Sequence, residues 1–352
     1  MSPVMGVPSP LRDRALRVAV LAGGPSAEHE VSLSSGASVR DGLLEAGHDV
    51  LWIEIGRDGI WRSEGAVLSV VPGEGLLGAD VAFPVLHGPY GEDGTVQGML
   101  ETLGVAYVGA GVAASAVCLD KILFKQLMSV AGVAQVDYAG LALRHFRRSP
   151  QATVAELARL GLPVFVKPAH LGSSLGIVKV SAQEDLMAAL EAAFAYDERV
   201  IVEAMATGTE VECGLLGAPG GAFVSEPGEI CFEGDWYDFE AKYTPGGMRL
   251  QVPAGISAGA ARRVRELALL AFEASGCEGL ARVDFFVDGE LVLLNELNTM
   301  PGFTPTSVYG KLLDASGVPY TELLARLCAL ARERHERMRA AGAPAPSSGA
   351  AR

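Results

Sequence analysis

The spacing of apolar residues predicts an α/β protein. A short apolar run at 17–22 leads into Gly23-Gly24, an amphipathic segment follows at 32–46, and a second apolar run occupies 50–55. Short apolar runs bounded by glycine are typical of buried strands, and the segment between them has helical spacing. Strand, glycine turn, helix and strand predict a βαβ unit that binds ligands at the carboxyl ends of its strands. The expected buried stripe of this helix consists of Leu33, Ala37, Leu43 and Leu44.

The rest of the chain continues to alternate between strand-like and helix-like segments. Further strands are predicted at 81–86, 164–168, 177–180 and 200–203, with more between 210 and 225. Further helices are predicted from Thr95 onward and at 121–130, 181–194, 258–274 and 320–338. No apolar run approaches the ~20 residues needed to span a bilayer. The fold class is therefore α/β, or α+β over the whole chain.

One predicted hairpin carries polar residues inside two apolar runs. Side chains two apart on a strand share a face, so Arg282 lies with Asp284, and Glu296 lies with Asn298. A two-residue turn would place the two pairs on opposite faces of the hairpin. A three-residue or bulged turn, with Gly289 at positive φ, would bring all four side chains together. We expect the bulged turn.

This hairpin predicts a metal site. The carboxylates of Asp284 and Glu296 and the amide carbonyl of Asn298 suit a hard cation such as magnesium. The alternative is the solvated outer face of an edge hairpin. Residues 291–294 are apolar without alternation, which indicates that both faces are covered and favours the metal site. Beyond the hairpin, Gly302 would let a backbone N–H approach a ligand closely.

Composition and charge narrow the class of protein. A chain of 352 residues is expected to form two or three domains. The formal net charge of −14 argues against nucleic acid and anionic membranes as partners, and an anionic nucleotide would need locally concentrated cations. Residues 1–17 do not resemble a signal peptide. The five scattered cysteines are typical of reduced thiols in a cytosol.

Polar residues at the ends of the first strands are candidate ligand contacts. Glu28 either compensates the dipole of the following helix or grips an ammonium group, and spacing alone leaves both readings open. His87 follows a strand and precedes a glycine, although a lone histidine is usually structural. Residues 109–114 match the loose G-x-G-x-x-A pattern, but not after the first strand, so a tight turn is the better interpretation.

Later segments indicate a phosphate site and a lid. Lys167 ends a strand and precedes a Gly/Ser loop at 169–176, which is typical of a phosphate clamp, although an ordinary polar hairpin is the alternative. Glu203 at a strand end is expected to accept from a ribose or adenine group, or to be a surface acid. Residues 231–247 are long, irregular and aromatic, and we interpret them as a lid carrying Lys242 and Tyr243.

Together these motifs resemble the D-alanine–D-alanine ligases of the ATP-grasp superfamily. The similarity covers about residues 17–335 and rests on ordered motifs at 23–33, 86–101, 120–121, 166–176, 237–243 and 282–304. It implies an ATP-grasp fold with a Rossmann-like N-terminal domain. The implied domains are 17–118, 119–208 and 209–338, with a flexible N-terminus at 1–16 and a disordered tail at 339–352.

The resemblance also implies a reaction. ATP with two Mg²⁺ (or Mn²⁺) phosphorylates the carboxylate of one D-alanine, and the amine of a second D-alanine attacks the acyl phosphate. The product supplies peptidoglycan precursor synthesis. A cytoplasmic homodimer is implied, with D-alanine and ATP as partners and with no nucleic acid or membrane. The alternative is a D-alanine–D-lactate or D-alanine–D-serine ligase, although the unaltered E-A-K-Y motif favours D-alanine.

The resemblance further assigns roles residue by residue. The first D-alanine would be held by Glu28, His87 and Ser173, the oxyanion by Arg282 and the Gly302 N–H, and the second D-alanine by Ser307 and Val308. ATP would be bound by Lys121, Lys167, Ser174, Glu203, Glu210 and Lys242, with Tyr243 closing over the site. The two metal ions would be held by Asp284, Glu296 and Asn298. The segment Ala204-Met205-Ala206 and the small Val308 depart from the usual family residues.

Overall fold

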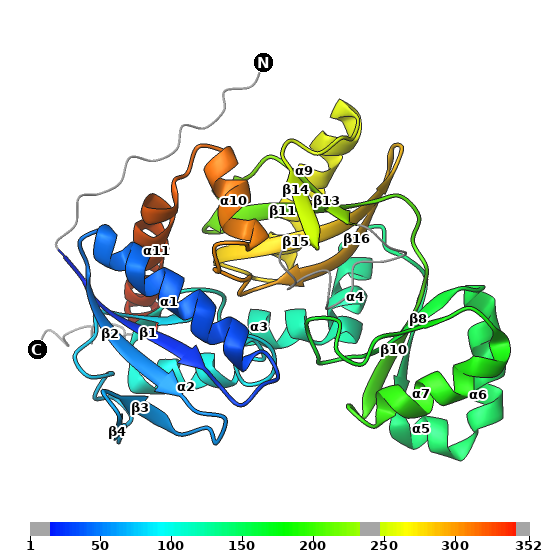
Figure 1. Ribbon diagram of the computed structural model, residues 1–352, viewed down its shortest axis with the longest axis horizontal. Helices are drawn as coiled ribbons and strands as arrows, with labels where there is room; N and C mark the ends of the chain where they lie inside the picture. The colour runs from blue at the N-terminus through cyan, green and yellow to red at the C-terminus, as the bar shows by residue number, and fades with distance from the viewer. Residues whose placement is uncertain (1–14, 233–246, 343–352) are drawn as a thin grey trace, which may run out of the picture.

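The computed structural model describes residues 15–232 and 247–342 and contains three β-sheets (Figure 1). The first sheet has the order β4-β3-β2-β1-β5-β6, in which β2, β1, β5 and β6 are parallel. Its strands are β1 (Arg17–Gly23), β2 (Asp49–Ile55), β3 (Trp61–Ser63), β4 (Ala66–Val67), β5 (Val81–Pro84) and β6 (Ala106–Tyr107). Its helices are α1 (His29–Glu45), α2 (Thr95–Leu103) and α3 (Val112–Leu119). Strands β1 and β5 are buried on both faces, as apolar strands of a parallel sheet must be.

The second sheet is antiparallel, with the order β7-β10-β8-β9. It consists of β7 (Tyr138–Ala142), β8 (Val164–Pro168), β9 (Val178–Val180) and β10 (Arg199–Ala204). The helices are α4 (Lys121–Val130), α5 (Leu143–Arg148), α6 (Pro150–Leu157) and α7 (Leu186–Phe194), with 3₁₀ turns η1 (Ala158–Leu160) and η2 (Gln183–Asp185). In β8 the buried Val164 and Val166 alternate with Phe165 and Lys167, so the lysine lies on the face opposite the helix-covered core.

The third sheet has the order β14-β13-β11-β15-β16, with β12 paired to β11. Its strands are β11 (Thr209–Gly217), β12 (Phe223–Val224), β13 (Gly228–Phe232), β14 (Met248–Gln251), β15 (Gly279–Asp288) and β16 (Leu291–Asn298). The helices that follow its strands are α9 (Ala258–Ala274), α10 (Val308–Ala315) and α11 (Tyr320–Gly342). The helices predicted at 121–130 and 258–274 are confirmed to the residue.

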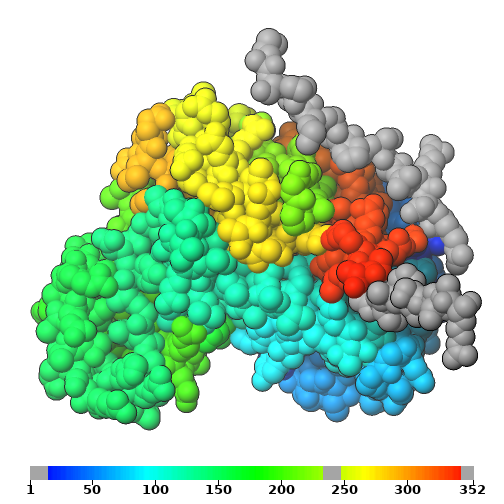
Figure 2. Space-filling model, turned by 180° about the vertical axis from the view of Figure 1, so that it is seen from behind, coloured from blue at the N-terminus to red at the C-terminus, as the bar shows by residue number. Residues whose placement is uncertain are grey.

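The C-terminal helices return to the N-terminal sheet. Figure 2 shows α11 (red) lying against the cyan N-terminal segment. Phe83 of β5 meets Phe303 edge-on with ring centroids 5.5 Å apart, and Tyr309 and Leu324 belong to the same buried cluster. The first and third sheets therefore share one core. None of the helices within the described ranges is long and apolar enough to cross a membrane.

The β15–β16 hairpin puts its four polar residues on one face, but not by the mechanism that we predicted. Asp288 pairs with Leu291, so the turn itself has two residues, and Gly289 has φ +59° as expected. The register shifts inside the strands, where Asp284 faces Glu296 but Phe285 faces Leu294, leaving Asn295 as a bulge. The expected bulged turn is therefore wrong, because one extra residue within β16 restores the parity.

Two further expectations about burial are wrong in part. Of the stripe predicted for α1, Leu43 is buried, Leu33 and Ala37 are half-buried, and Leu44 is exposed. The inward face of α1 carries His29, Ser32, Ser35, Gly36, Val39, Gly42 and Leu43, whereas Leu44 is 52% exposed. Serine hydroxyls are buried there because each has partners, such as the carbonyl of Val85 for Ser32. Residues 291–294 are not covered on both faces, since Leu291 is exposed. The predicted helix at 181–194 begins only at Leu186, and the strand predicted at 81–86 ends at Pro84.

Candidate active site

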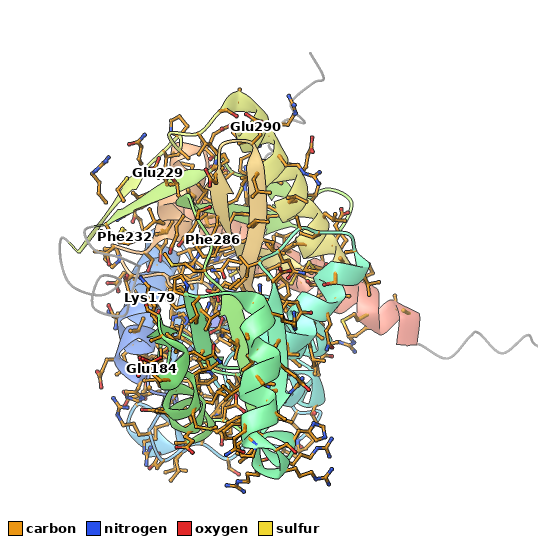
Figure 3. The ribbon with its side chains drawn as sticks, turned by 90° about the vertical axis from the view of Figure 1, so that its right-hand side faces the viewer. Lys179, Glu184, Glu229, Phe232, Phe286 and Glu290 are labelled. Carbon is orange, nitrogen blue, oxygen red and sulfur yellow. The ribbon has the colours of Figure 1, made fainter. Side chains whose placement is uncertain are left out.

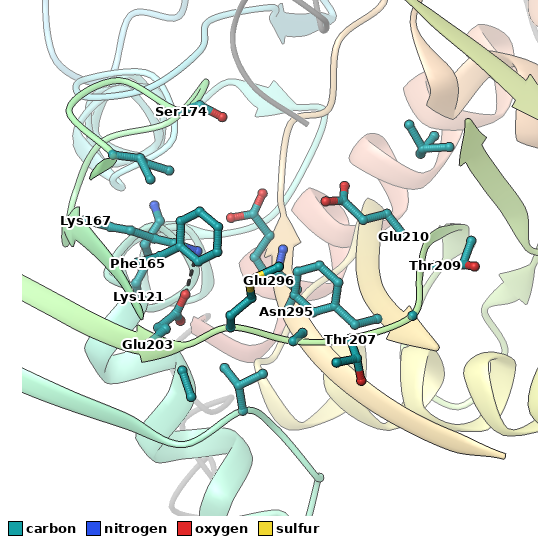
Figure 4. Close-up of a pocket in the computed structure, with 18 of the residues that line it drawn as sticks. Lys121, Phe165, Lys167, Ser174, Glu203, Thr207, Thr209, Glu210, Asn295 and Glu296 are labelled. Atoms are coloured by element: carbon teal, nitrogen blue, oxygen red, sulfur yellow. Dashed lines mark ion pairs between the residues drawn. The ribbon is translucent and has the colours of Figure 1, made fainter. Parts of the chain in front are cut away.

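A large cleft lies between the second and third sheets. It has a volume of about 640 Å³, and its lining includes residues of α4, β8, β10, β11, β13, β15 and β16 and of the loop that follows β8. Figure 3 shows Phe232 and Phe286 on the third sheet above Lys179 on the second. In Figure 4, Lys167, Phe165 and Ser174 lie on one side of the cleft, and Glu296 lies toward the other. Apolar rings and cations in one cleft suit a nucleotide base and its phosphates.

Glu203 is buried between two lysines at the floor of the cleft. One carboxylate oxygen is 3.0 Å from Nζ of Lys125, and the other is 2.5 Å from Nζ of Lys167. Burial would raise the pKa of Glu203, but the two ammonium groups lower it to about 2. The surface-acid reading of Glu203 is therefore wrong. Lys125, which is 1% exposed, was missed because nothing in the sequence distinguishes it from a surface lysine on α4.

The loop after β8 reaches from the second sheet to the first. Ser173 and Ser174 both have positive φ (49° and 59°), a conformation that side chains other than glycine rarely adopt. The hydroxyl of Ser173 donates to Oε1 of Glu28, and Nζ of Lys121 donates to the carbonyl of Leu171 at 2.5 Å. Glu28 is the N-cap residue of α1 but makes no side-chain cap hydrogen bond, and its carboxylate faces the loop of the second sheet instead.

Arg282 organises the polar face of the hairpin. Its Nε and Nη2 donate to the two oxygens of Asp284 at 2.8 and 2.7 Å, and Nε lies 2.8 Å from Oε2 of Glu212. Burial alone would lower the pKa of Arg282, but the surrounding carboxylates raise it well above its usual value. Nδ2 of Asn298 donates to Oδ2 of Asp284 at 3.1 Å, so the amide oxygen of Asn298 is not the atom that faces Asp284. Glu212, on β11, was missed because no strand pattern marks it.

The donors on this face fit a hard divalent cation by type. Asp284 and Glu296 are directly opposed across the hairpin, and Asn298 adds an amide oxygen. No group of three or more histidine, cysteine or acidic side chains suited to a metal is found within residues 15–232 and 247–342. The hairpin offers two acids and one amide, which is an oxygen-only set of the kind that magnesium prefers.

A smaller cavity of about 120 Å³ adjoins the large cleft. Its lining includes Glu28, His87, Arg282, Gly302, Ser307 and Val308, and it shares Gly172, Ser173 and Glu296 with the large cleft. A Cβ on Gly302 would come within 2.6 Å of Oγ of Ser307, so the Ser307 side chain would have to move to admit any other residue there. The volume suits small molecules such as amino acids rather than a nucleotide.

His87 is a neutral wall of this cavity. Nδ1 lies 3.1 Å from the carbonyl of Met300, so it carries the proton, and Nε2 faces the hydroxyl of Ser35 at 3.4 Å. Burial lowers its pKa, although the charge of Glu28 acts in the opposite direction. Both ring nitrogens therefore contact the protein itself.

A second acid, Glu92, lines this cavity, and the sequence did not predict it as a site residue. Glu92 accepts from the N–H of Gly88 at 2.7 Å, and burial, together with the charge of Glu28, raises its pKa to about 8. Glu92 follows His87 closely after the end of a strand, and this position was the signal that could have marked it as a site residue. Lys242 and Tyr243 lie outside the described residues.

Comparison with known proteins identifies the family. Residues 17–74 and 69–110 match the D-ala D-ala ligase N-terminus, and residues 127–329 match the D-ala D-ala ligase C-terminus. The chain belongs to the D-alanine–D-alanine ligase family. It is therefore an enzyme of the ligase class, and the family is ATP-dependent.

Individual relatives agree with this family assignment. The D-alanine–D-alanine ligase of Deinococcus radiodurans is 47% identical over 337 residues, covering 90% of this chain and 98% of the relative. The structure of the D-alanine–D-alanine ligase from Coxiella burnetii superimposes with a TM-score of 0.83 at 33% identity, covering 94% of this chain and 97% of that one. The structure of the VanG D-Ala:D-Ser ligase from Enterococcus faecalis superimposes with a TM-score of 0.80 at 34% identity. The match covers 90% of this chain and 100% of that one.

These neighbours confirm the ATP-grasp fold of this D-alanine–D-alanine ligase family member. The residues that we expect to depart from the usual family pattern lie on the cavity walls. Ala204, Met205 and Ala206 all line the large cleft, and Val308 begins α10 beside the small cavity.

Proposed function

We propose that this ligase joins two D-alanines to form D-alanyl-D-alanine at the expense of ATP. The observation that carries the proposal is the junction of the two cavities at Gly172, Ser173 and Glu296. A nucleotide in the large cleft would present its terminal phosphate to an amino acid in the small cavity. The amino-acid carboxylate oxygen attacks the γ-phosphorus, ADP leaves, and an acyl phosphate forms.

The nucleotide cleft supplies cations against the negative charge of the whole protein. Lys121 and Lys167 neutralise phosphate oxygens, and Ser174 adds a hydroxyl, with Glu210 placed near the ribose. Glu203 acts chiefly through its ion pairs, since Lys125 and Lys167 engage both oxygens. A carboxylate retains free lone pairs, so a further hydrogen bond to the nucleotide is compatible with these pairs.

Asp284, Glu296 and Asn298 would hold two Mg²⁺ or Mn²⁺ ions. Such ions, when bound, neutralise the phosphates so that two anions can meet. Asp284 is also held by Arg282 through both oxygens, which fixes its orientation. That arrangement resembles the outer-shell hydrogen bonds that orient metal-binding carboxylates in other proteins.

The small cavity binds and orients both amino acids. Glu28, placed by Ser173, takes the ammonium of the first D-alanine, with the neutral His87 as a wall. The guanidinium of Arg282 and the N–H of Gly302 stabilise the oxyanion as the second amine attacks the carbonyl carbon. The amine loses its proton, and phosphate leaves. Ser307 and Val308 receive the carboxylate and methyl group of the second D-alanine. Donors of this kind contribute about 3–4 kcal/mol each.

The remaining parts of the proposal concern the lid and the cellular setting. Lys242 would contact the transferred phosphoryl group, and Tyr243 would close over the site, excluding the water that hydrolyses an acyl phosphate. The three sheets support domains at 17–118, 119–208 and 209–338. We also propose a cytoplasmic homodimer that supplies peptidoglycan precursor synthesis.

The decisive experiment measures ADP release by the purified protein with magnesium and ATP. We expect turnover with D-alanine and only background with L-alanine or with no amino acid. Background release with D-alanine would overturn the proposed function.

An acceptor other than D-alanine is the second candidate, because the VanG D-Ala:D-Ser ligase superimposes on most of the chain. Product analysis with D-alanine plus D-serine or D-lactate, at several pH values, separates the two. We expect D-alanyl-D-alanine as the main product. A predominant mixed product would favour the alternative.

A further inference from the structure

A histidine held between two aspartates lies at the base of the loop that carries Ser173. The backbone N–H and Nδ1 of His170 both contact Oδ2 of Asp197, at 2.9 and 2.8 Å. Nε2 lies 3.2 Å from Oδ2 of Asp120. Ionised carboxylates only accept hydrogen bonds, so both ring nitrogens donate, and the ring is an imidazolium.

Both aspartates are fixed in the second sheet and its helices. Oδ1 of Asp120 caps α4 by accepting two backbone N–H groups of its first turn, at 3.0 and 3.1 Å, while Oδ2 contacts Arg199. Oδ1 of Asp197 accepts the N–H of Arg199 at 2.9 Å. Two acids and two bases thus form a neutral cluster. His170 is the member of this cluster that belongs to the loop.

The loop beyond His170 needs external support. Ser173 and Ser174 have left-handed backbone angles, and such conformations persist only where the surroundings impose them. Lys121 supports the loop once more, through the carbonyl of Leu171. At its tip the loop crosses to the first sheet, where Ser173 meets Glu28.

We propose that His170 is a positioning residue whose charged ring fixes the base of this loop and so places Ser173 against Glu28. His170 is absent from the lining of both cavities, so it acts through Ser173 and not on a substrate. Only the kinetic part of its test rests on the proposed function.

The cluster makes this positioning dependent on pH. Hydrogen bonds to Asp120 and Asp197 raise the pKa of His170 to about 9. The groups that face the ring are these two carboxylates, with Arg199 behind Asp120 and Lys121 on the adjoining turn of α4. Above that pH the ring loses a proton and one of its two donors. The loop then loses one of its links to the cluster.

The test compares His170→Asn, His170→Arg and the control His145→Asn, which changes an exposed histidine on α5. His170→Asn removes the charge and one donor. We expect it to raise the KM for D-alanine roughly tenfold with little change in kcat, because the defect is one of placement. We expect the KM for D-alanine of the wild-type protein to rise above pH 9, where the ring loses its charge. His170→Arg keeps a permanent cation with several donors, so it should retain the low KM and should not show this rise.

Two measurements need no turnover. Hydrogen exchange at residues 169–176 should speed up in His170→Asn and stay unchanged in His145→Asn, and an NMR titration should place the ring of His170 near pH 9. Wild-type exchange and KM in His170→Asn, or a ring that titrates near 6.5, would overturn the inference. If exchange and titration behave as expected while wild-type protein releases no ADP, the proposed function fails and the role of His170 in the loop stands.

Discussion

Ser173 donates a hydrogen bond to Glu28, which lies 145 residues earlier in the chain. The two residues come from loops on different sheets, and the contact closes one side of the small cavity. A Cβ on Gly172 would lie 3.1 Å from Oε2 of Glu28, so the loop backbone also approaches this carboxylate closely. The placement of Glu28 therefore depends on a loop of the second sheet.

Ser173→Ala should lower kcat/KM for D-alanine by roughly 10- to 100-fold, since hydrogen bonds to charged groups contribute about 1.5–3 kcal/mol. Steady-state kinetics with D-alanine as the varied substrate measures this. The matched control, Ser174→Ala, should chiefly affect the KM for ATP. Equal effects of both variants on D-alanine would contradict the contact's role.

Glu296→Gln should abolish turnover and leave the fold intact, because an amide replaces one of two opposed acids that hold the metal ions. Removing a residue that only hydrogen-bonds to a metal ligand lowers metal affinity or activity by about 10- to 100-fold. Replacing a ligand itself should therefore lower activity by more. Circular dichroism and titration with magnesium monitor fold and binding. Glu290→Gln, at the exposed turn of the same hairpin, is the control. A wild-type rate in Glu296→Gln would remove the metal assignment.

Lys125→Met should destabilise the protein by about 3 kcal/mol and lower the thermal midpoint by roughly 6–12 °C, because it breaks a buried ion pair of Glu203. The pKa of Glu203 is lowered to about 2, so the stabilisation is complete above its unfolded value near 4.5 and is lost as the pH falls through 2. Differential scanning calorimetry at several pH values measures this. Lys311→Met on the exposed side of α10 should change the midpoint by less than about 2 °C.

Glu92→Gln should make stability less dependent on pH. The pKa of Glu92 is raised to about 8, so the folded state binds more protons than the unfolded state between pH 4.5 and 8, and wild-type stability falls as pH rises through that interval. Glutamine mimics the protonated acid. The midpoint difference between variant and wild type, measured with a chelator present, should be small near pH 5 and grow toward pH 9. A difference that is constant with pH, as expected for the exposed control Glu74→Gln, would refute this.

Lys242→Ala should slow phosphate release from ATP plus D-alanine far more than it weakens ATP binding. The reason is that Lys242 is proposed to contact the phosphoryl group only as it is transferred. Single-turnover phosphate release and equilibrium nucleotide binding separate the two effects. Equal losses in both would place the lysine in ground-state binding instead.

The hairpin and the first helix show how far sequence patterns reach. The two-residue period correctly paired Arg282 with Asp284 and Glu296 with Asn298. The position of the bulge at Asn295 was not predictable, because a bulge is decided by how a strand fits its neighbours. The buried stripe of α1 was misassigned because its inward serines have hydrogen-bond partners on other segments, such as the carbonyl of Val85.

The charge environments of Lys125, Glu212 and Glu92 could not be predicted from the sequence for the same reason. Each acquires its charge environment from partners on other elements: Glu203 on β10, Arg282 on β15 and Glu28 before α1. A lysine or glutamate has the same local pattern whether it is solvated or buried. Only the assembled fold distinguishes the two cases.

The sequence by itself determined the approximate positions of the predicted strands and helices, the motif order and the polar pairs of the hairpin, because these depend on neighbours a few positions apart. The tertiary structure alone decided that two cavities meet at Ser173 and Glu296, and that His170 carries a charge between two aspartates. Electrostatic environment and cavity shape depend on distances between remote segments. Those distances are fixed only when the three sheets pack together.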